Sequence, residues 1–112
     1  MTDLAAKRCK PCEGGVPPLS PESTRELLKD LDGWEIAAGG GEIRRSFSFR
    51  EFHRTMAFVN AVAWIAHREN HHPDLEVGYD RCLVRYTTHA IRGLSENDFI
   101  CAAKIDGLWK EA

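Results

Sequence analysis

Apolar and polar residues follow two different periods along this chain, one typical of strands and one typical of helices. Apolar residues alternate with polar ones through residues 34–49, interrupted by glycines at 39–41, and again through residues 75–88. Alternation with a period of two predicts half-buried strands, and a turn inside each stretch makes each one a β-hairpin. The chain therefore contains two predicted hairpins.

A long amphipathic helix is predicted between the two hairpins. Its apolar residues recur at steps of three and four, which places one buried stripe along the helix: Phe52, Met56, Val59, Ala63 and Ala66. Residues 48–51 fit a capping box at its start. Pro73 pushes the preceding residue towards extended geometry, so the helix must end near Asn70 or His71.

Two shorter helices flank the hairpins. Ser20 followed by Pro21 predicts an N-cap with proline at the first helical position, and Gly33 ends that helix. Residues 95–98 begin a last helix with an acidic residue in its first turn. The resulting order, α-β-β-α-β-β-α, predicts an α+β fold in which a four-stranded antiparallel sheet carries the helices on one face.

Residues 1–19 are rich in Pro and Gly. We therefore expect an extended arm there, followed by a single domain over residues 20–112. The arm contains Cys9 and Cys12 in a CxxC spacing, which in this setting fits neither a thioredoxin-like helix start nor a complete metal site. A structural role, a subunit contact and metal binding stay open for this pair. Cys82 and Cys101 are expected to be free thiols that pack as small apolar residues.

Length and charge exclude some classes of protein. With 112 residues, the chain is long enough for one hydrophobic core and too short for a two-domain enzyme. Its 15 Lys and Arg residues against 17 Asp and Glu residues give a net charge of −2, so no nucleic-acid partner is expected. No apolar run approaches the ~20 residues of a transmembrane helix, and no secretory signal is visible, which predicts a cytoplasmic protein without a membrane partner.

Histidines gather around the second predicted hairpin. If the turn of that hairpin is residues 80–81, His72 and His89 lie opposite each other on neighbouring strands, with Cβ atoms about 5 Å apart. His71 lies at the same mouth, next to His72 in the sequence. Asp98, in the first turn of the last helix, is a candidate to orient one of the imidazoles.

Clustered imidazoles can transfer protons near neutral pH, bind Zn²⁺ or simply pack. Three of them at one strand end favour a functional role over packing. His53 lies outside the apolar stripe and is expected at the surface. His67 and His71 have the i, i+4 spacing of a helical chelate, but no Glu of an HExxH motif lies between them, so zinc is the second interpretation.

The spacing of these residues forms a longer pattern that runs from residue 67 to residue 98. It consists of His67-x3-His71-His72-Pro73, an aromatic residue at Tyr79, then His89 and Asp98. This pattern resembles the signature of the pterin-4a-carbinolamine dehydratases. Residues 88–95 and the predicted order of elements are similar to that family as well, so the resemblance covers about residues 20–110.

The resemblance implies an enzyme that dehydrates 4a-hydroxytetrahydropterin, the product left by an aromatic amino acid hydroxylase, to quinonoid dihydropterin. His71, His72 and His89 correspond to the catalytic residues, with no metal or organic cofactor, and which of them is the acid stays open. The implied substrate contacts are these histidines and four neighbours, Pro73, Thr88, Ala90 and Ile91.

The resemblance also implies supporting residues and partners. The first signature position is often Glu in the family and is His67 here, so acidic support for His71 is expected from Asp98, with His67 as a second supporting residue. The family implies a homodimer or homotetramer and a functional link to a phenylalanine hydroxylase. Some members are linked to a molybdopterin-related pathway instead, and the sequence does not choose between the two.

Two rival hypotheses come from other functional classes. Some animal members of the family also act as dimerisation cofactors for a homeodomain transcription factor, which makes a protein-binding module the second hypothesis, although no residue here points to it. The third hypothesis is a small metal-binding protein that uses His71, His72 and His89 together with Cys9 and Cys12.

Overall fold

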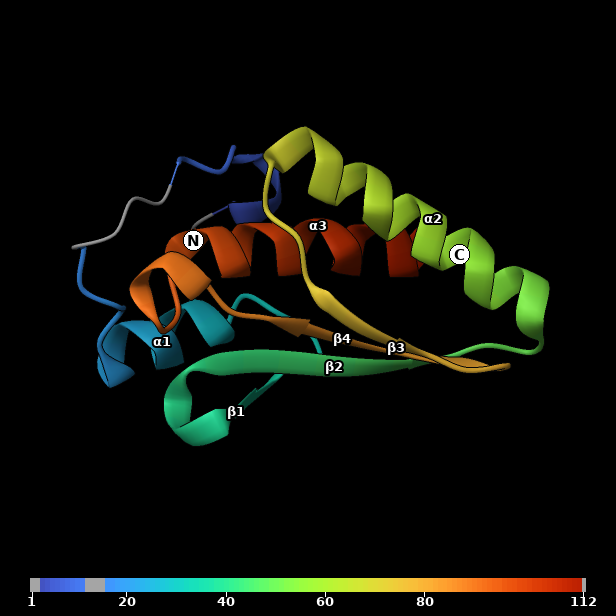
Figure 1. The fold of residues 1–112 in the computed structure, drawn as a ribbon, viewed down its shortest axis with the longest axis horizontal. Helices are drawn as coiled ribbons and strands as arrows, with labels where there is room; N and C mark the ends of the chain where they lie inside the picture. The colour runs from blue at the N-terminus through green and yellow to red at the C-terminus, as the bar shows by residue number, and fades with distance from the viewer. Residues whose placement is uncertain (1–2, 12–15, 112) are drawn as a thin grey trace.

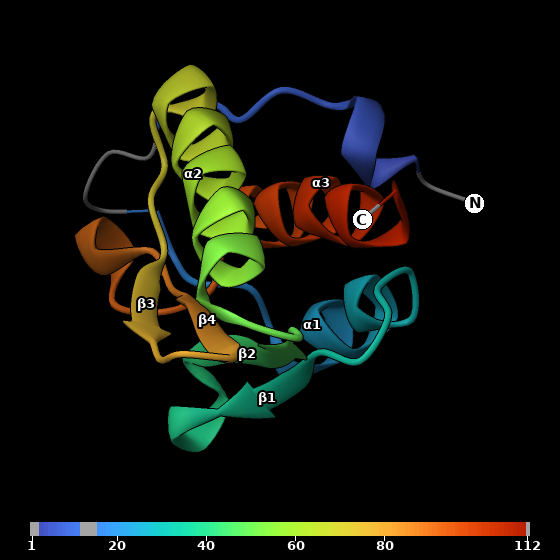
Figure 2. The ribbon, with the colours of Figure 1, turned by 90° about the vertical axis from the view of Figure 1, so that its right-hand side faces the viewer.

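The sheet at the centre of the fold has four antiparallel strands in the order β1-β2-β4-β3, with helices on one face (Figure 1 and Figure 2). The computed structural model describes residues 3–11 and 16–111. Its strands are β1 (Glu35–Ala37), β2 (Glu42–Ser48), β3 (Asp74–Val77) and β4 (Arg81–Tyr86), and its helices are α1 (Pro21–Leu28), α2 (Phe52–Glu69) and α3 (Glu96–Glu111). The predicted α+β class and element order are confirmed.

The hydrophobic core lies between the inner face of the sheet and the two long helices. Aromatic rings join the layers, since the Phe47 ring centroid lies 4.7 Å from that of Phe58 in α2 and 5.3 Å from that of Trp109 in α3. Alternate residues of β2 and β4 point inward, as predicted, and α3 adds a second row. All of these side chains are at most 1% exposed: Ile43, Phe47, Cys82, Val84, Tyr86, Phe99, Ile100 and Ile105.

The predicted buried stripe of α2 is wrong by a rotation of the helix. Phe52 is 46% exposed and Ala63 is exposed, whereas Thr55, Phe58 and Val62 are buried. Thr55 can be buried because its hydroxyl lies 2.9 Å from the Tyr79 carbonyl and 3.0 Å from the Glu51 carbonyl, so its one proton has an acceptor in either direction. The pattern of apolar residues cannot predict a buried position that is occupied by a hydrogen-bonded polar side chain.

None of the helices in residues 3–11 and 16–111 has the length and the apolar character that are needed to span a membrane.

Two helix starts can be compared with their predicted caps. α1 begins as predicted, with the Ser20 hydroxyl accepting from the Ser23 amide at 3.2 Å. α2 begins later than the capping box suggested, because Ser48 is still the last residue of β2 and the N-cap is Glu51. The Glu51 carboxylate accepts from the Arg54 amide at 3.0 Å, which satisfies one open N–H of the first turn.

The second hairpin has a different register from the one expected. Val77 pairs with Cys82 and the Gly78 amide donates to the Arg81 carbonyl at 2.8 Å, so the turn is Tyr79–Asp80 rather than residues 80–81. The turn is held in this position by neighbouring elements, since the Asp80 carbonyl accepts from the Phe49 amide at 2.7 Å. A slip of two residues keeps every side chain on the same face, so the hydrophobic pattern cannot distinguish the two registers.

The N-terminal arm is not wholly extended as expected. Residues Leu4–Ala6 form one 3₁₀ turn, in which Leu4 is buried in the core and only 2% exposed. The Lys104 ammonium of α3 donates to the Ala5 carbonyl at 2.7 Å. The described part of the arm then runs past α3 to the C-terminal end of α2 (Figure 2). Cys12 lies outside the described residues.

Gly93 lies where the loop after β4 meets the segment before α1. A Cβ at this position would lie 2.7 Å from the Pro18 Cβ, closer than side chains pack. We expect Gly93→Ala to destabilise the protein by about 1–3 kcal/mol, because the two segments must separate to admit the methyl group. The free energy of unfolding, measured in urea, tests this.

Gly107 provides the matched control for that substitution. It lies inside α3, and a Cβ there would meet no atom within 4 Å. Gly107→Ala should therefore stabilise the protein by about 0.5–1 kcal/mol, since alanine favours the helix. Equal effects of the two substitutions would contradict the close approach at Gly93.

Candidate active site

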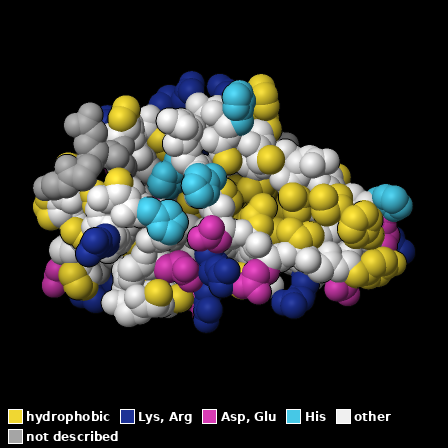
Figure 3. All heavy atoms as spheres, in the orientation of Figure 1, with side chains coloured by type: hydrophobic (Ala, Val, Ile, Leu, Met, Phe, Trp, Pro, Cys, Tyr) yellow, Lys and Arg dark blue, Asp and Glu magenta, His cyan; other side chains and the backbone are white. Residues whose placement is uncertain are grey.

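A cavity of about 490 Å³ lies where the end of α2, the start of β3 and the loop after β4 meet. Its walls are residues 9–11 of the arm, residues 68–72, residues 87–90 and Asn97. Histidine side chains cluster on this face of the molecule, next to a group of acidic side chains (Figure 3). Four segments that are far apart in the sequence therefore meet at this cavity.

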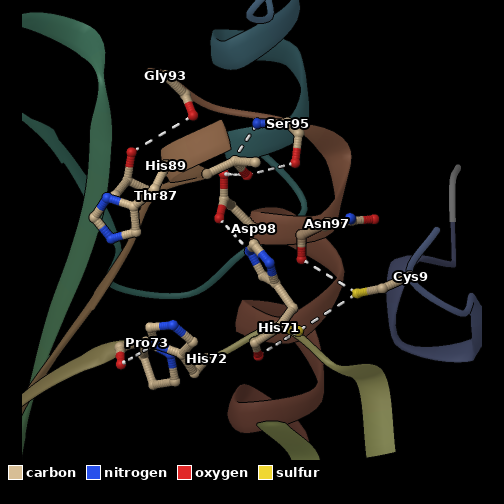
Figure 4. Close-up of polar contacts among 12 residues, drawn as sticks. Cys9, His71, His72, Pro73, Thr87, His89, Gly93, Ser95, Asn97 and Asp98 are labelled. Carbon is tan, nitrogen blue, oxygen red and sulfur yellow. Dashed lines mark hydrogen bonds and ion pairs between the residues drawn. The ribbon is translucent and has the colours of Figure 1, made fainter. Parts of the chain in front are cut away.

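Asp98 is the buried anchor of this region. It lies in the first turn of α3 and its side chain is fully buried. One carboxylate oxygen accepts from the Thr88 hydroxyl at 2.8 Å and from the Ser95 amide at 2.9 Å, and the other lies 2.6 Å from the His71 Nε2 (Figure 4). A buried carboxylate is stable only with such partners.

His71 reaches Asp98 because α2 ends sharply. Asn70 takes the left-handed conformation with φ 51°, which Asn tolerates better than most residues. The His71 amide still donates to the Ala66 carbonyl at 3.2 Å, so the residue leaves the helix at a defined angle. Its ring stacks on Tyr86 of β4, with centroids 5.5 Å apart and planes at 11°. Helix end and strand therefore fix the imidazole from two sides.

The charge of His71 is set by its partner. Burial alone lowers the pKa of the imidazole, but the hydrogen bond to Asp98 and the negative charge of that carboxylate outweigh burial, so the pKa of His71 lies above its usual 6.5. Because an ionised carboxylate only accepts, the proton of this contact is assigned to Nε2, and Nδ1 is the other ring nitrogen that can exchange a proton. His71 is thus held towards its protonated form near neutral pH.

His72 and His89 form a second, more open pair. Their ring centroids are 6.4 Å apart with planes at 28°. The His72 Nδ1 donates to the Pro73 carbonyl at 3.2 Å, which leaves Nε2 of a neutral ring as an acceptor. The His89 side chain is 69% exposed, and its Nε2 lies 4.0 Å from a carboxylate oxygen of Asp74. The two histidines are neighbours, although the strand register that predicted this was wrong.

The loop that carries His89 is closed on itself. The Thr88 amide donates to the Gly93 carbonyl at 2.9 Å, and residues His89–Ile91 form a short 3₁₀ turn inside this bridge. The Thr88 hydroxyl also contacts the Ser95 hydroxyl at 2.7 Å. The loop is therefore tied to the first turn of α3 through the same residues that hold Asp98.

The structure brings together most of the residues singled out from the sequence. His71, His72, Thr88, His89 and Ala90 line the cavity, and Asp98 contacts His71 from behind it.

Three candidates from the sequence lie elsewhere. The exposed His67 ring packs on Trp64 of the same helix, with centroids 5.4 Å apart, and does not line the cavity, so its expected auxiliary role stays a prediction. Ile91 is buried and Pro73 is half-buried, and neither lines the cavity. His53 is exposed, as expected.

Sequence reasoning missed the wall formed by the arm. Cys9, Lys10 and Pro11 line the cavity because the Cys9 amide donates to the Glu69 carboxylate at 2.8 Å and the Lys10 amide donates to the Asn97 side chain at 3.0 Å. Glu69 is buried, which opposes its charge, but the bond from Cys9 and the nearby Arg8 hold the pKa of the carboxyl below its usual range. No local pattern signals these long-range contacts.

The site combines a histidine whose pKa is raised by a buried carboxylate with two further imidazoles at the same cavity. Within residues 3–11 and 16–111, no group of three or more His, Cys, Asp or Glu side chains is arranged to hold a metal ion. The arrangement is suited to moving protons on a molecule bound between the segments.

Comparison with known proteins identifies relatives along nearly the whole chain. Residues 17–108 match the sequence profile of the pterin 4 alpha carbinolamine dehydratase family. A protein of Nitrosospira multiformis is 65% identical over 110 residues, covering 98% of this chain and 96% of that protein. A protein of Legionella pneumophila is 56% identical over 108 residues, covering 96% of each chain. Both are provisionally named pterin-4-alpha-carbinolamine dehydratases.

Solved structures share the fold. The crystal structure of a Brucella melitensis protein, described as a transcriptional coactivator/pterin dehydratase, matches with a TM-score of 0.78 at 33% identity, covering 81% of this chain and 97% of that one. A pterin dehydratase-like protein, described as a RuBisCO assembly factor in the alpha-carboxysome, matches with a TM-score of 0.60 over 70% of this chain and 92% of that one. At 20% identity, that likeness concerns the fold alone.

The contact with Asp98 allows the protonation of His71 to be predicted. We expect the pKa of His71 in the folded protein to lie above 6.5 and to fall in Asp98→Asn, because burial remains while the compensating charge is lost. A titration of the imidazole resonances by NMR measures both values. The resonances of the exposed His53 serve as the internal reference for this comparison.

The same contact links protonation to stability. Because the pKa of His71 is raised on folding, its contribution to stability is complete below pH about 6.5 and disappears as the pH rises through the folded-state pKa. The difference in unfolding free energy between the wild type and Asp98→Asn should therefore shrink over that interval. A difference that grows with pH would show that His71 is not stabilised as the cation.

Proposed function

The chain belongs to the pterin 4 alpha carbinolamine dehydratase family, and from this premise we propose that it dehydrates 4a-hydroxytetrahydropterin to quinonoid dihydropterin and water by histidine acid-base catalysis. The observation that carries this proposal is the buried Asp98–His71 pair beside His72 and His89 at one cavity. Among the described residues, no other cavity has a histidine paired with a buried carboxylate and further imidazoles beside it.

The reaction needs two proton movements. A proton must reach the 4a-hydroxyl oxygen so that it leaves as water, and a proton must leave a ring nitrogen so that the quinonoid product forms. Positioned imidazoles perform both steps near neutral pH, since their ordinary pKa lies close to it. In this proposal the protein supplies orientation and protonation, and the bond changes occur within the pterin.

His71 is the proposed acid. Asp98 favours its cationic form, and the stack on Tyr86 fixes the ring plane. Because Asp98 favours the cation, a larger share of the protein carries a proton on His71 that can be given to the leaving hydroxyl. After the transfer, Asp98 holds the neutral ring in one tautomer, ready to be protonated again by solvent.

His89 is the proposed base, and His72 is proposed to position the pterin and to share the proton transfer. The Nε2 of His72 is an acceptor because its Nδ1 donates to the Pro73 carbonyl. His89 and His72 are close enough to contact one flat ring together. Backbone groups around Thr88, Ala90 and Ile91, with the segment at Pro73, are the further proposed contacts with the substrate.

The proposed setting is recycling of the pterin that an aromatic amino acid hydroxylase consumes, in the cytoplasm and in a homodimer or homotetramer. The family membership supports the pterin substrate. A phenylalanine hydroxylase is the proposed source of the carbinolamine, and a molybdopterin-related pathway is the alternative. Identifying the neighbouring genes would discriminate between the two.

A protein-binding role is the second candidate. It is favoured by one observation, that the Brucella melitensis relative is described as a transcriptional coactivator as well as a pterin dehydratase. The intact set of histidines around Asp98 favours the enzyme, since binding to a protein partner does not require a held proton. Turnover of the carbinolamine separates the two roles directly.

Substitution of the proposed acid and base should slow the reaction strongly. We expect His71→Ala and His89→Ala each to reduce the rate of 4a-hydroxytetrahydropterin dehydration by at least ~10²-fold, the usual effect of losing a general acid or base. The rate is measured by the disappearance of the carbinolamine, after subtraction of the spontaneous reaction. His53→Ala, an exposed histidine in the first turn of α2, is the matched control and should turn over at the wild-type rate.

Two results would overturn this assignment. Full activity of the His71→Ala/His89→Ala double variant would remove the histidines from the mechanism. A large loss of the dehydration rate on exhaustive chelation would instead favour the metal-binding alternative, because the proposed proton transfers need no metal.

A further inference from the structure

Two thiols lie in contact at the edge of the cavity and have no role in the proposed dehydration. The Sγ atoms of Cys9 and Cys101 are 3.6 Å apart, although the residues come from opposite ends of the chain. Neither forms a disulfide, and Cys101 is fully buried in α3 while Cys9 is half-buried in the arm. The pair lies next to His71, whose carbonyl oxygen is 3.9 Å from the Cys101 Sγ.

The arm holds Cys9 in this position through hydrogen bonds on both sides. The Cys9 amide donates to the buried Glu69 carboxylate, and the next residue, Lys10, exchanges two bonds with Asn97. The Lys10 amide donates to the Asn97 side-chain oxygen at 3.0 Å, and the Asn97 side-chain amide donates to the Lys10 carbonyl at 2.6 Å. The side chain of Cys9 therefore points towards α3 rather than towards solvent (Figure 4).

We propose that Cys9 and Cys101 are a redox-active dithiol that a small hydroperoxide oxidises to an intramolecular disulfide, which attaches the arm covalently to α3 along the cavity wall. A disulfide has an S–S length of about 2.05 Å, so the two sulfurs must approach by about 1.5 Å from their contact distance. The arm can supply this movement because one short 3₁₀ turn is the only helical structure in its residues 3–11, and hydrogen bonds rather than a regular element hold it near Cys9.

The cavity gives the oxidant its access. Cys9 lines it, whereas Cys101 lies behind the arm and does not. The Cys9 sulfur attacks the peroxide and its proton passes to the departing oxygen, so the O–O bond breaks and a sulfenic acid and one water form. The Cys101 thiolate then attacks the Cys9 sulfur and displaces hydroxide, which takes a proton from solvent and leaves as the second water. Two thiols lose two electrons, and hydrogen peroxide is reduced to two water molecules.

The electrostatics of the pair favour the second step. The hydrogen bond with Cys9 lowers the pKa of the Cys101 thiol against the effect of burial, and the charge of His71 lowers it further. The same hydrogen bond, together with burial, raises the pKa of Cys9. Of the two sulfurs, Cys101 is therefore the one that loses its proton more easily, and it is the one that must attack the sulfenic acid.

The remaining cysteines are separated from this pair in different ways. Cys82 is fully buried in β4, and burial raises the pKa of its thiol, so it is expected to stay reduced. Cys12 follows Cys9 by three positions, and this CxxC spacing allows a disulfide between the two. A test must therefore distinguish a Cys9–Cys101 bond from a Cys9–Cys12 bond.

The experiment uses Cys12→Ser in the full chain, treated with hydrogen peroxide, alkylated, and digested with trypsin without reduction. Trypsin leaves Cys9 on peptide 9–25, because Lys10 is followed by proline, and it leaves Cys101 on peptide 93–104. We expect mass spectrometry to find these two peptides joined in most molecules, with the protein mass lowered by two hydrogens. Dithiothreitol should separate them and restore both thiols.

The controls make the result specific. Cys12→Ser/Cys82→Ser should give the same joined peptide, whereas Cys12→Ser/Cys101→Ser should give none. Oxidation of Cys12→Ser to Cys9 sulfinic acid without a joined peptide would overturn the proposal, and so would joining of Cys9 to Cys82 in the folded protein. The readout is a mass, so its outcome is independent of whether the protein turns over a pterin.

Discussion

The buried carboxylate of Asp98 is the interaction on which the rest of this site depends. From the first turn of α3 it binds the residue just before that helix, the loop after β4 and the segment that follows α2, through Ser95, Thr88 and His71. A charge without water is tolerated only where every oxygen is satisfied. The geometry of the cavity and the protonation of His71 therefore have one cause, and neither can change without the other.

The elements could be predicted from the sequence, but the way they pair and pack could not. Alternation in β2 and β4 and the Ser20–Pro21 start of α1 are local signals, and the structure confirms them. The register of the second hairpin is set by hydrogen-bond donors outside the hairpin, such as the Phe49 amide. The alternation of apolar and polar residues carries no information about these donors. The buried face of α2 includes Thr55, whose polar side chain is satisfied only in the folded protein.

The candidate site divides in the same way. His71, His72, His89 and Asp98 could be singled out because their chemistry and spacing are visible in the sequence, and the structure places them around one cavity. His72 and His89 are close together, as expected, but strand pairing is not the reason. The hydrogen bond between Thr88 and Gly93 closes the loop that places His89 beside His72. The arm at residues 9–11 could not be placed, because its anchors are buried side chains far along the chain.

The contact between the arm and α3 also determines when the site can form during synthesis. Cys9 and Lys10 leave the ribosome early, but their partners Cys101 and Asn97 emerge only with the last helix. The same holds for Asp98, the partner of His71. Until then the sheet lacks the cover that α3 provides for its apolar face, and Tyr86 has only part of its surroundings. A nascent chain of this protein therefore completes its core and its cavity only after the last helix has left the ribosome.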